Sequence, residues 1–199
     1  MAIAVEHEKR KQEILDKALA IFVEEGYEDA TFQKIADRCG ITRTTLYIYF
    51  RNKREIFTWS IKQLTQNIEA TLSLVIADQN INTETKLRMV IDKILCVCQE
   101  KARLFTVVLN YLLAQQKAGK NPAEMVRRRI LRLRHLLSTV LIEGLKRNQL
   151  TTTNVKAANE MLYALIESSI FRIAVLNQTS EELSIAIDLA INSLVKKEN

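Results

Sequence analysis

Residues that interrupt helices are scarce in this chain, and this scarcity constrains its fold more than any other feature. The 199 residues include one proline and four glycines. Sheets and loop-rich folds need many turns, and turns depend heavily on these two residue types. We therefore predict an all-α protein whose helices are joined by short connections.

Apolar residues recur at intervals of three and four along most of the chain, which is typical of amphipathic helices. Hydrophobic residues make up 48% of the sequence and charged residues 26%, which is enough for a proper core in one or two domains. After residue 54 the pattern predicts six helices. Their expected positions are 55–77, a helix that starts at 83 or 84, 103–116, 121–148, 155–177 and 179–196.

Two start signals support these limits. Asn121 followed by Pro122 combines a capping side chain with a proline at the first helical position. Thr179 followed three residues later by Glu182 has the pattern of a capping box. Both signals indicate new helices that begin after short connections.

The segment from Thr31 to Lys53 reads TFQKIADRCGITRTTLYIYFRNK and contains two short helical patterns. Gly40 supplies the turn between them, since glycine adopts positive φ without a Cβ clash. Thr42 can cap the helix that follows. Leu46 and Phe50 lie four residues apart on a face that packs inward. The segment therefore predicts a helix-turn-helix, whose second helix fits the major groove of DNA.

Positive charge is concentrated on the same segment. Residues 31–54 include six basic residues and one acidic residue, a balance of +5, whereas residues 1–30 include four basic and eight acidic residues, a balance of −4. A local positive field of this kind is what binding to phosphates requires. We treat Lys34, Arg38 and Arg54 as solvated surface charges, because exposed lysines and arginines are the norm.

The turn and the second helix resemble the TetR family of bacterial helix-turn-helix transcription regulators. The shared pattern is Cys39-Gly40-Ile41-Thr42, then Thr45-Leu46-Tyr47-Ile48-Tyr49-Phe50, and Lys53. Upstream, an apolar repeat over residues 14–22 stops at Glu25-Gly26-Tyr27, like the family's first helix and its exit turn. The resemblance implies an N-terminal three-helix DNA-binding domain, residues 1–54, and a C-terminal six-helix domain, residues 55–199, that binds an effector and dimerises.

Carried over by position, the resemblance implies nine DNA-binding residues. The implied phosphate contacts are Thr31, Thr42, Tyr47 and Lys53, and the implied base-reading residues are Gln33, Arg43, Thr44, Thr45 and Tyr49. Arg43 is the most attractive reader, since a guanidinium can bond O6 and N7 of guanine together. Thr44 and Ile48 depart from the family pattern, which usually has Gly or Ala at the first position and a polar or aromatic residue at the second. A core position is the alternative for either tyrosine, although the two cannot share one buried helical face.

Eight residues on the later helices are candidates for lining an effector cavity. They are Trp59, Phe105, Asn110, Tyr111, Met125, Tyr163, Glu167 and Phe171. Ordinary core packing is the alternative for these positions, because core residues follow the same helical spacing. Glu167, which is polar within an apolar run, fits either a ligand contact or a dimer seam. The sequence does not identify the effector.

The resemblance also implies a homodimer formed through the last two helices, and their apolar surface is more than one small domain can cover. A two-fold dimer presents two recognition helices to an inverted repeat. We therefore expect a repressor bound to a palindromic operator in double-stranded DNA and released by a small-molecule effector. The alternative is a DNA-bound factor of the same fold that contacts a protein partner through the arginines of residues 127–134. For those arginines a solvated helix face is the simpler interpretation.

Other classes of protein are disfavoured. Two histidines, no Gly-rich phosphate loop and no nucleophile in a recognisable setting argue against an enzyme, and no cofactor is expected. Three cysteines without finger-type spacing indicate buried thiols in a reducing compartment and no metal site. No apolar run reaches the ~18 residues of a membrane span, and residues 1–12 lack the apolar stretch of a signal peptide. We expect a cytoplasmic protein without membrane contact.

Overall fold

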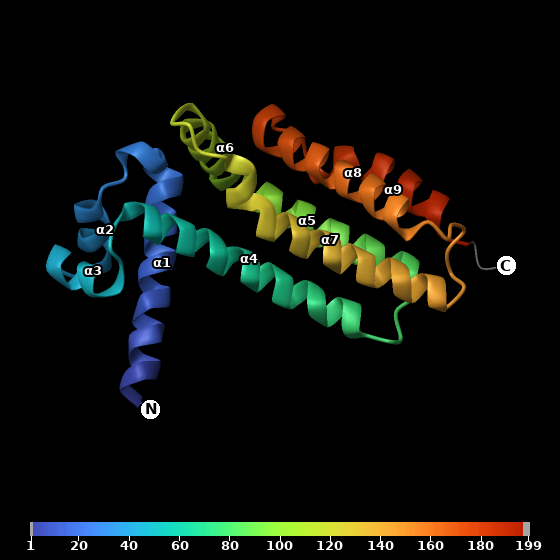
Figure 1. Ribbon diagram of the computed structural model, residues 1–199, viewed down its shortest axis with the longest axis horizontal. Coiled ribbons are helices and arrows are strands. Elements are labelled where there is room, and N and C mark those ends of the chain that lie inside the picture. Colours follow the sequence, from blue (N-terminus) through green and yellow to red (C-terminus); the bar gives the residue numbers. More distant parts are fainter. Residues whose placement is uncertain (1, 197–199) are drawn as a thin grey trace. The chain divides into compact units, whose positions relative to one another are not determined.

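The computed structural model describes residues 2–196, with side chains from residue 5 onward, as nine α-helices and no β-strand (Figure 1). The helices are α1 (Ala2–Asp29), α2 (Phe32–Cys39), α3 (Arg43–Tyr49), α4 (Lys53–Ala77), α5 (Thr83–Glu100), α6 (Ala102–Lys117), α7 (Pro122–Lys146), α8 (Val155–Leu176) and α9 (Ser180–Leu194). The predicted all-α class and the six helices that follow the helix-turn-helix are confirmed. None of the helices described is long and apolar enough to cross a membrane.

Side-chain caps begin several helices at the expected positions. Asn121 accepts a hydrogen bond from a backbone N–H in the first turn of α7, where Pro122 is the first residue. Thr179 and Glu182 make both hydrogen bonds of the predicted capping box at α9. These starts depend on neighbouring residues only, which is why the sequence predicts them well.

The end of α9 differs from the prediction. The helix was expected to continue through Lys196, but it ends at Leu194. Beyond it the backbone pairs with the segment that precedes α8: the Thr151 N–H donates to Leu194 O over 2.8 Å, and the Lys196 N–H donates to Gln149 O over 2.9 Å. These partners lie more than 40 residues away, so helical periodicity does not reveal them.

The chain divides into two compact units. The first contains residues 1–67 and 107–111, and the second contains residues 68–106 and 112–199. The boundary between the two units falls within α4, between residues 67 and 68. The family resemblance in the sequence places the end of the DNA-binding domain earlier, at residue 54. Because α4 is one continuous helix, the extent of the DNA-binding domain remains a prediction.

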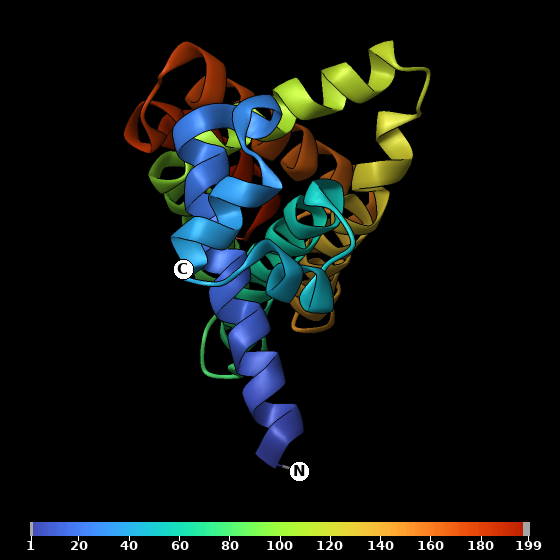
Figure 2. The same cartoon turned by 90° about the vertical axis from the view of Figure 1, so that its left-hand side faces the viewer.

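The first unit packs α1 against α2, and α2 against α3. Ala18 and Phe22 of α1, Ile35 of α2 and Leu46 of α3 are fully buried. The backbone of α1 leaves helical geometry at Gly26, where φ is 87°, so the expected exit turn is a kink within a helix that continues to Asp29. Figure 2 shows the first turn of α1 extending beyond α2 and α3.

An aromatic cluster completes the core of the first unit. The ring of Tyr27 lies 4.5 Å from that of Tyr111 and 5.0 Å from that of Phe57, measured between centroids. Phe22 meets Phe57 edge to face at 4.9 Å. Burial raises the pKa of Tyr27 to about 12. Tyr111 thus belongs to the core of this unit.

The second unit contains a bundle of α5, α7, α8 and α9 (Figure 1), together with the end of α4 from residue 68 and most of α6. Helix α8 packs against α5, α7 and α9, and α5 also packs against α7 and α9. Its core consists of aliphatic side chains that recur at helical spacing on each of the four helices. Among the most buried are Leu87, Val90, Leu137, Leu141, Leu162, Ile166, Ile187 and Ile191.

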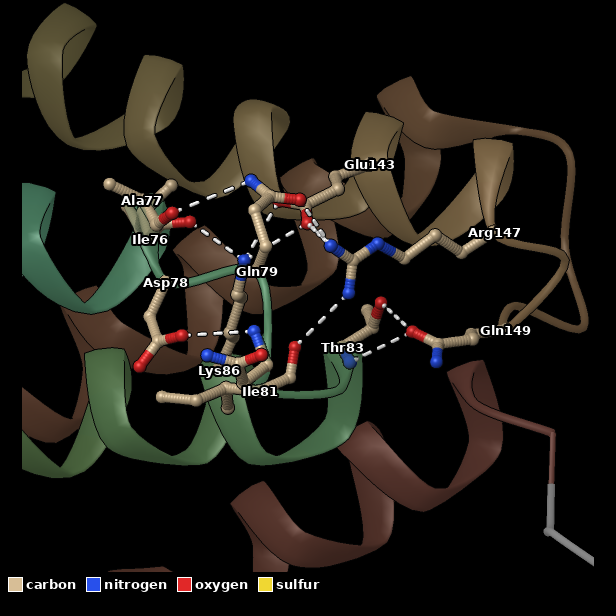
Figure 3. Close-up of polar contacts among 11 residues, drawn as sticks. Ile76, Ala77, Asp78, Gln79, Ile81, Thr83, Lys86, Glu143, Arg147 and Gln149 are labelled. Carbon is tan, nitrogen blue, oxygen red and sulfur yellow. Dashed lines mark hydrogen bonds and ion pairs between the residues drawn. The ribbon is translucent and has the colours of Figure 1, made fainter.

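A buried lysine joins two helices of this bundle, α5 and α7, to the end of α4 (Figure 3). Lys86 on α5 is 1% exposed. Its Nζ donates to the carbonyl oxygen of Ile76, near the end of α4, over 2.7 Å and to both carboxylate oxygens of Glu143 on α7 over 2.9 and 3.0 Å. Because a buried charge is costly unless it is paired and hydrogen-bonded, these partners explain how Lys86 is accommodated. We call this set of residues, with Thr83, Gly144, Arg147 and Gln149, the Lys86 junction.

The rest of the junction ties the α4–α5 connection to the end of α7 (Figure 3). Arg147 pairs with Glu143 over 2.7 Å and donates to the carbonyl oxygen of Ile81 over 3.3 Å. The side-chain oxygen of Gln149 accepts from the Thr83 N–H over 3.0 Å and from its hydroxyl over 2.6 Å. Thr83 is itself buried. Apart from the pair of Glu143 with Arg147, which lie four residues apart on α7, these contacts join residues 66 positions apart and follow from no sequence motif.

The three cysteines do not share one environment. Cys39 and Cys98 are buried, whereas Cys96 is exposed, so the expectation of three buried thiols is wrong at Cys96. Two positions apart on α5, Cys96 and Cys98 point to different sides of the helix, as their spacing predicts. Burial raises the pKa of the Cys98 thiol to about 12. Within the part of the chain that the structure describes, no three His, Cys, Asp or Glu side chains form a group able to hold a metal ion.

Candidate nucleic-acid interface

The turn between α2 and α3 has the predicted geometry. Gly40 adopts φ 67° and ψ 34°, and its N–H bonds the carbonyl oxygens of Ala36 and Asp37. The Ile41 N–H also donates to Ala36 O over 3.1 Å. This left-handed ending terminates α2 and redirects the chain into α3 within a few residues.

Two of the predicted phosphate-binding hydroxyls are helix caps. The Thr31 hydroxyl accepts from the Lys34 N–H over 3.2 Å, and the Thr42 hydroxyl accepts from the Thr45 N–H over 3.1 Å. The hydroxyls of Thr42 and Thr45 also lie 2.8 Å apart. A hydroxyl that accepts at a cap keeps its own proton for donation, so Thr31 remains compatible with a phosphate contact as well.

Helix α3 presents one exposed face. Arg43, Thr44, Tyr47 and Ile48 are all exposed, whereas Leu46 is fully buried. Arg43 Nη2 donates to the Tyr47 hydroxyl over 3.2 Å, and its guanidinium carbon lies 5.8 Å from the centroid of that ring. These side chains have the donors and the exposure that contact with a groove requires.

Tyr47 and Tyr49 are both outside the core, as one helical face could not bury the pair. Tyr47 is 50% exposed and its ring centroid lies 4.6 Å from that of Phe32. Tyr49 is partly buried because His7 of α1 stacks on it, with centroids 4.6 Å apart and planes 21° apart. Sequence reasoning missed His7 as a neighbour of the recognition helix, since 42 residues separate the two rings. Neither helical pattern contains a signal for this contact.

Lys53 and Gln33 already have protein partners. Lys53 Nζ donates to the carbonyl oxygens of Tyr27 and Glu28 over 2.7 and 2.9 Å and lies 4.5 Å from the centroid of the Tyr27 ring. Gln33 donates to the Asp37 carboxylate over 2.7 Å. Lys53 thus ties the start of α4 to the end of α1, and a phosphate contact would have to share its ammonium group with these carbonyls.

Two of the three basic residues expected from the sequence to be surface charges form ion pairs with carboxylates of α1. Lys34 lies 2.8 Å from Glu25, and Arg38 lies 2.7 Å from Glu24. The hydrogen bond from Arg38 holds the pKa of Glu24 below its ordinary value. Arg54 is exposed.

The eight candidate effector residues are divided between the two units. Trp59, Asn110 and Tyr111 belong to the first unit, whereas Phe105, Met125, Tyr163, Glu167 and Phe171 belong to the second. Tyr111 lies in the aromatic cluster, with its hydroxyl buried and without a hydrogen-bond partner in the described structure. That any of these residues lines an effector cavity remains a prediction.

Local contacts account for several of these residues. The ring of Trp59 lies 4.4 Å from Lys11 Nζ and 4.0 Å from Lys62 Nζ. Tyr163 donates to Glu167 over 2.7 Å, and its pKa is raised by burial and by this carboxylate. Phe171 is 52% exposed and Asn110 is also exposed.

Two surface hollows lie at the ends of long helices. One, of about 320 Å³, is lined by Asn82, Thr83, Glu84, Asn148, Gln149, Val195 and Lys196. The other, of about 310 Å³, is lined by Arg51, Asn52, Arg54, Glu55, Thr58 and Trp59. Trp59 is the one candidate effector residue that lines either of these two hollows.

Comparison with known families identifies the helix-turn-helix. Residues 14–58 match the model of the "Bacterial regulatory proteins, tetR family". The match covers most of α1, all of α2 and α3 and the start of α4, which are the elements that build the candidate interface. It confirms the resemblance found in the sequence. The family consists of transcription regulators and not enzymes.

Curated relatives align over different lengths. The HTH-type transcriptional regulator SrpR of Pseudomonas putida is 43% identical over 53 residues, which cover 27% of this chain and a quarter (25%) of that protein. The fatty acid metabolism regulator protein of Bacillus subtilis is 22% identical over 163 residues, which cover 79% of this chain and 80% of that protein. The first match is confined to the length of one domain, whereas the second extends over most of both proteins.

Solved structures share the whole fold. A TetR transcription regulator from Haloarcula marismortui superposes with a TM-score of 0.80 at 21% identity, covering 95% of this chain and 100% of that one. The transcriptional regulator FadR of Bacillus subtilis, in complex with stearoyl-CoA, superposes with a TM-score of 0.72 at 20% identity, covering 94% of this chain and 98% of that one. Each likeness extends over more than nine-tenths of this chain.

Proposed function

Since the chain belongs to the TetR family of bacterial transcription regulators, we propose that it is a cytoplasmic homodimeric repressor that binds a palindromic operator and is released by a small-molecule effector. In this proposal residues 1–54 bind double-stranded DNA, and residues 55–199 bind the effector and dimerise. Each of these roles rests on a different observation.

The exposed face of α3 carries the proposal for DNA binding. It combines Arg43, Thr44 and Tyr47 on a helix held by a glycine turn and a threonine cap. The region from residue 31 to 54 has a formal balance of +5, and although Lys34 and Arg38 are paired with α1, the remaining excess of positive charge attracts phosphates. Arg43 and Thr44 stand at the start of α3, where recognition helices direct side chains to base edges.

Exposed apolar side chains on α8 and α9 support a dimer. Phe171, Leu176, Ile185 and Leu189 are between 52% and 77% exposed. A second copy of the same two helices would cover them. Because such a dimer has two-fold symmetry, its two α3 helices would meet the halves of an inverted repeat.

The class of effector that the comparisons favour is a long acyl chain with an anionic head group. The alignment with the fatty acid metabolism regulator extends through most of the C-terminal helices, whereas the match to SrpR is confined to 53 residues and carries no information about an effector site. The FadR structure of similar fold holds stearoyl-CoA. A ligand of this class would release DNA if it bound the non-binding conformation more tightly.

The alternative role is a protein contact through the arginines of α7. Fewer of these arginines are unpaired than the sequence suggests. Arg132 pairs with Glu69 over 2.9 Å, and Arg134 pairs with Glu160 and lies over the ring of Tyr163. Of the cluster, Arg127, Arg128 and Arg132 are exposed, and Arg129 is partly buried and donates to the Met125 carbonyl oxygen. The ion pairs favour a structural role for Arg132 and Arg134.

Selection from a random duplex pool tests the DNA claim. The purified protein, at a stated salt concentration, should enrich an inverted repeat, and its affinity for that repeat should fall steeply as salt rises. Enrichment of a single half-site would contradict the dimer. A pool that shows no enrichment, with or without an acyl-CoA present, would contradict sequence-specific binding altogether.

Titrations of the selected operator test the effector class. Stearoyl-CoA should weaken operator binding, whereas CoA without an acyl chain should leave the curve unchanged. Overlapping curves with and without stearoyl-CoA would reject this effector and leave the proposal for DNA binding intact.

A further inference from the structure

Ile48 is a large apolar side chain exposed in the middle of a polar helix face. It is 70% exposed. Its neighbours on that face are Thr44, one turn earlier, and the exposed Tyr47. Leu46, which anchors α3 in the core, points about 160° away around the helix axis at 3.6 residues per turn. Ile48 therefore lies on the face that the proposed function directs toward DNA.

The surroundings of Ile48 favour nucleic acid over a second protein surface. Thr44 lies about 40° from Ile48 around the helix axis and Arg43 about 140°, at the other edge of the exposed side, and α3 belongs to the most basic stretch of the first unit. Docking of another protein usually needs a contiguous apolar patch, which this charged face does not provide. A polyanion complements the charge, and in its major groove the C5-methyl group of thymine is the apolar group on the base edges.

We propose, on the basis of the proposed function, that Ile48 is a specificity-determining residue that recognises thymine through its C5-methyl group. The contact adds apolar recognition to the hydrogen bonds expected from Arg43. The two side chains are five positions apart, a rise of about 7.5 Å along α3, or roughly two base-pair steps. The thymine thus lies within about three base pairs of the guanine that Arg43 is expected to read.

Uracil scanning of the selected operator tests this contact directly. Each thymine of one half-site is replaced in turn by uracil, which removes the methyl group and keeps the hydrogen-bonding edge. We expect one replacement to weaken binding of the parent about three- to fivefold, the effect of one buried methyl group. With the Ile48→Ala variant the same replacement should change affinity less than twofold. Ile48→Val, which retains a branched apolar side chain, should restore most of the sensitivity to the methyl group.

A matched control separates this reading from a general surface effect. Leu74 on α4 is 76% exposed and lies in the second unit, so Leu74→Ala should keep the uracil profile of the parent. Operators selected with the Ile48→Ala variant should show no preference for thymine at the same position. The thermal midpoint of this variant should equal that of the parent. A parent that tolerates every uracil, or an Ile48→Ala variant as sensitive as the parent, overturns the inference while leaving DNA binding established. Failure of the parent to select any sequence overturns both.

Discussion

The exposed face of α3 and the Lys86 junction place basic side chains in opposite situations. Arg43 is exposed, and its described partner, Tyr47, lies on the same helix four residues away. Lys86 is 1% exposed and links α4, α5 and α7 through partners 10 and 57 residues away. A cation with a local partner is free to meet a polyanion without loss of tertiary contacts. A cation with distant buried partners holds helices together, so residue type alone does not separate the two roles.

The largest effect is expected at the junction. Lys86→Ala removes the ammonium partner of the Ile76 carbonyl and of Glu143, which keeps Arg147 as a partner, so the loss should be about 3 kcal/mol, the lower limit for breaking a buried pair on one side. Urea unfolding followed by circular dichroism measures the loss. The double variant Lys86→Met with Glu143→Leu should recover part of the stability, because it removes both charges of the pair and leaves Arg147 partly exposed with the Ile81 carbonyl as a partner. A loss below about 1 kcal/mol for Lys86→Ala would mean that the junction does not hold the bundle.

On the α3 face, the corresponding change should affect binding and not folding. Arg43→Ala should cost about 1–3 kcal/mol of affinity for the selected operator and relax the preference for one base, with an unchanged urea midpoint. Fluorescence anisotropy on the operator and on variants of one base pair measures both effects. Operator binding as tight as that of the parent would show that Arg43 does not read a base.

Lys53→Ala provides the contrast for Arg43→Ala. A phosphate contact carries no sequence information, so this variant should weaken all duplexes alike. Lys53 also donates to two carbonyl oxygens at the end of α1, so the free energy of unfolding of the variant should fall by about 1 kcal/mol. Loss of affinity on a single sequence only would assign Lys53 to base reading.

A smaller effect is expected from Gly144, where α7 passes close to α5. A Cβ atom there would lie 2.5 Å from the side chain of Thr83, which is buried and bonded to Gln149. Overpacking of this kind costs about 1–3 kcal/mol, against about 1 kcal/mol gained in helix propensity. Gly144→Ala should therefore lower the urea midpoint modestly. In a protein that already carries Thr83→Ala, the Gly144→Ala change should lower the urea midpoint by less. A Gly144→Ala variant more stable than the parent would show that α7 can shift away from Thr83.

The smallest effect is expected at His7. Removing the His7 ring should lower the free energy of unfolding by about 0.5–1.5 kcal/mol, the range for an aromatic pair. The loss should be close to the lower limit because His7 is exposed. His7→Ala should weaken operator binding slightly by freeing Tyr49, and His7→Phe should restore it. Anisotropy titrations of both variants at one salt concentration measure the difference. Equal affinities for parent and His7→Ala would show that Tyr49 does not need this neighbour.

Both regions contain features that were predictable and features that were not. In the first unit, the Gly40 turn and the Thr42 cap follow from residues within four positions of each other, and both are observed. The stack of His7 on Tyr49 joins two helices and has no such local signal. In the second unit the capping box of α9 was predictable, but the end of that helix was not, because its backbone pairs with the segment before α8.

The sequence by itself determined the helices, the caps at Thr42, Asn121 and Thr179 and the helix-turn-helix, since each depends on side chains one or two turns apart and on the local balance of charge. Only the tertiary structure decided which charged and thiol side chains are committed to the fold. It buried Lys86, engaged Lys53 with α1 and left Arg43, Ile48 and Cys96 exposed. The physical reason is that burial and ion pairing depend on residues brought together from distant parts of the chain, and no local pattern records those partners.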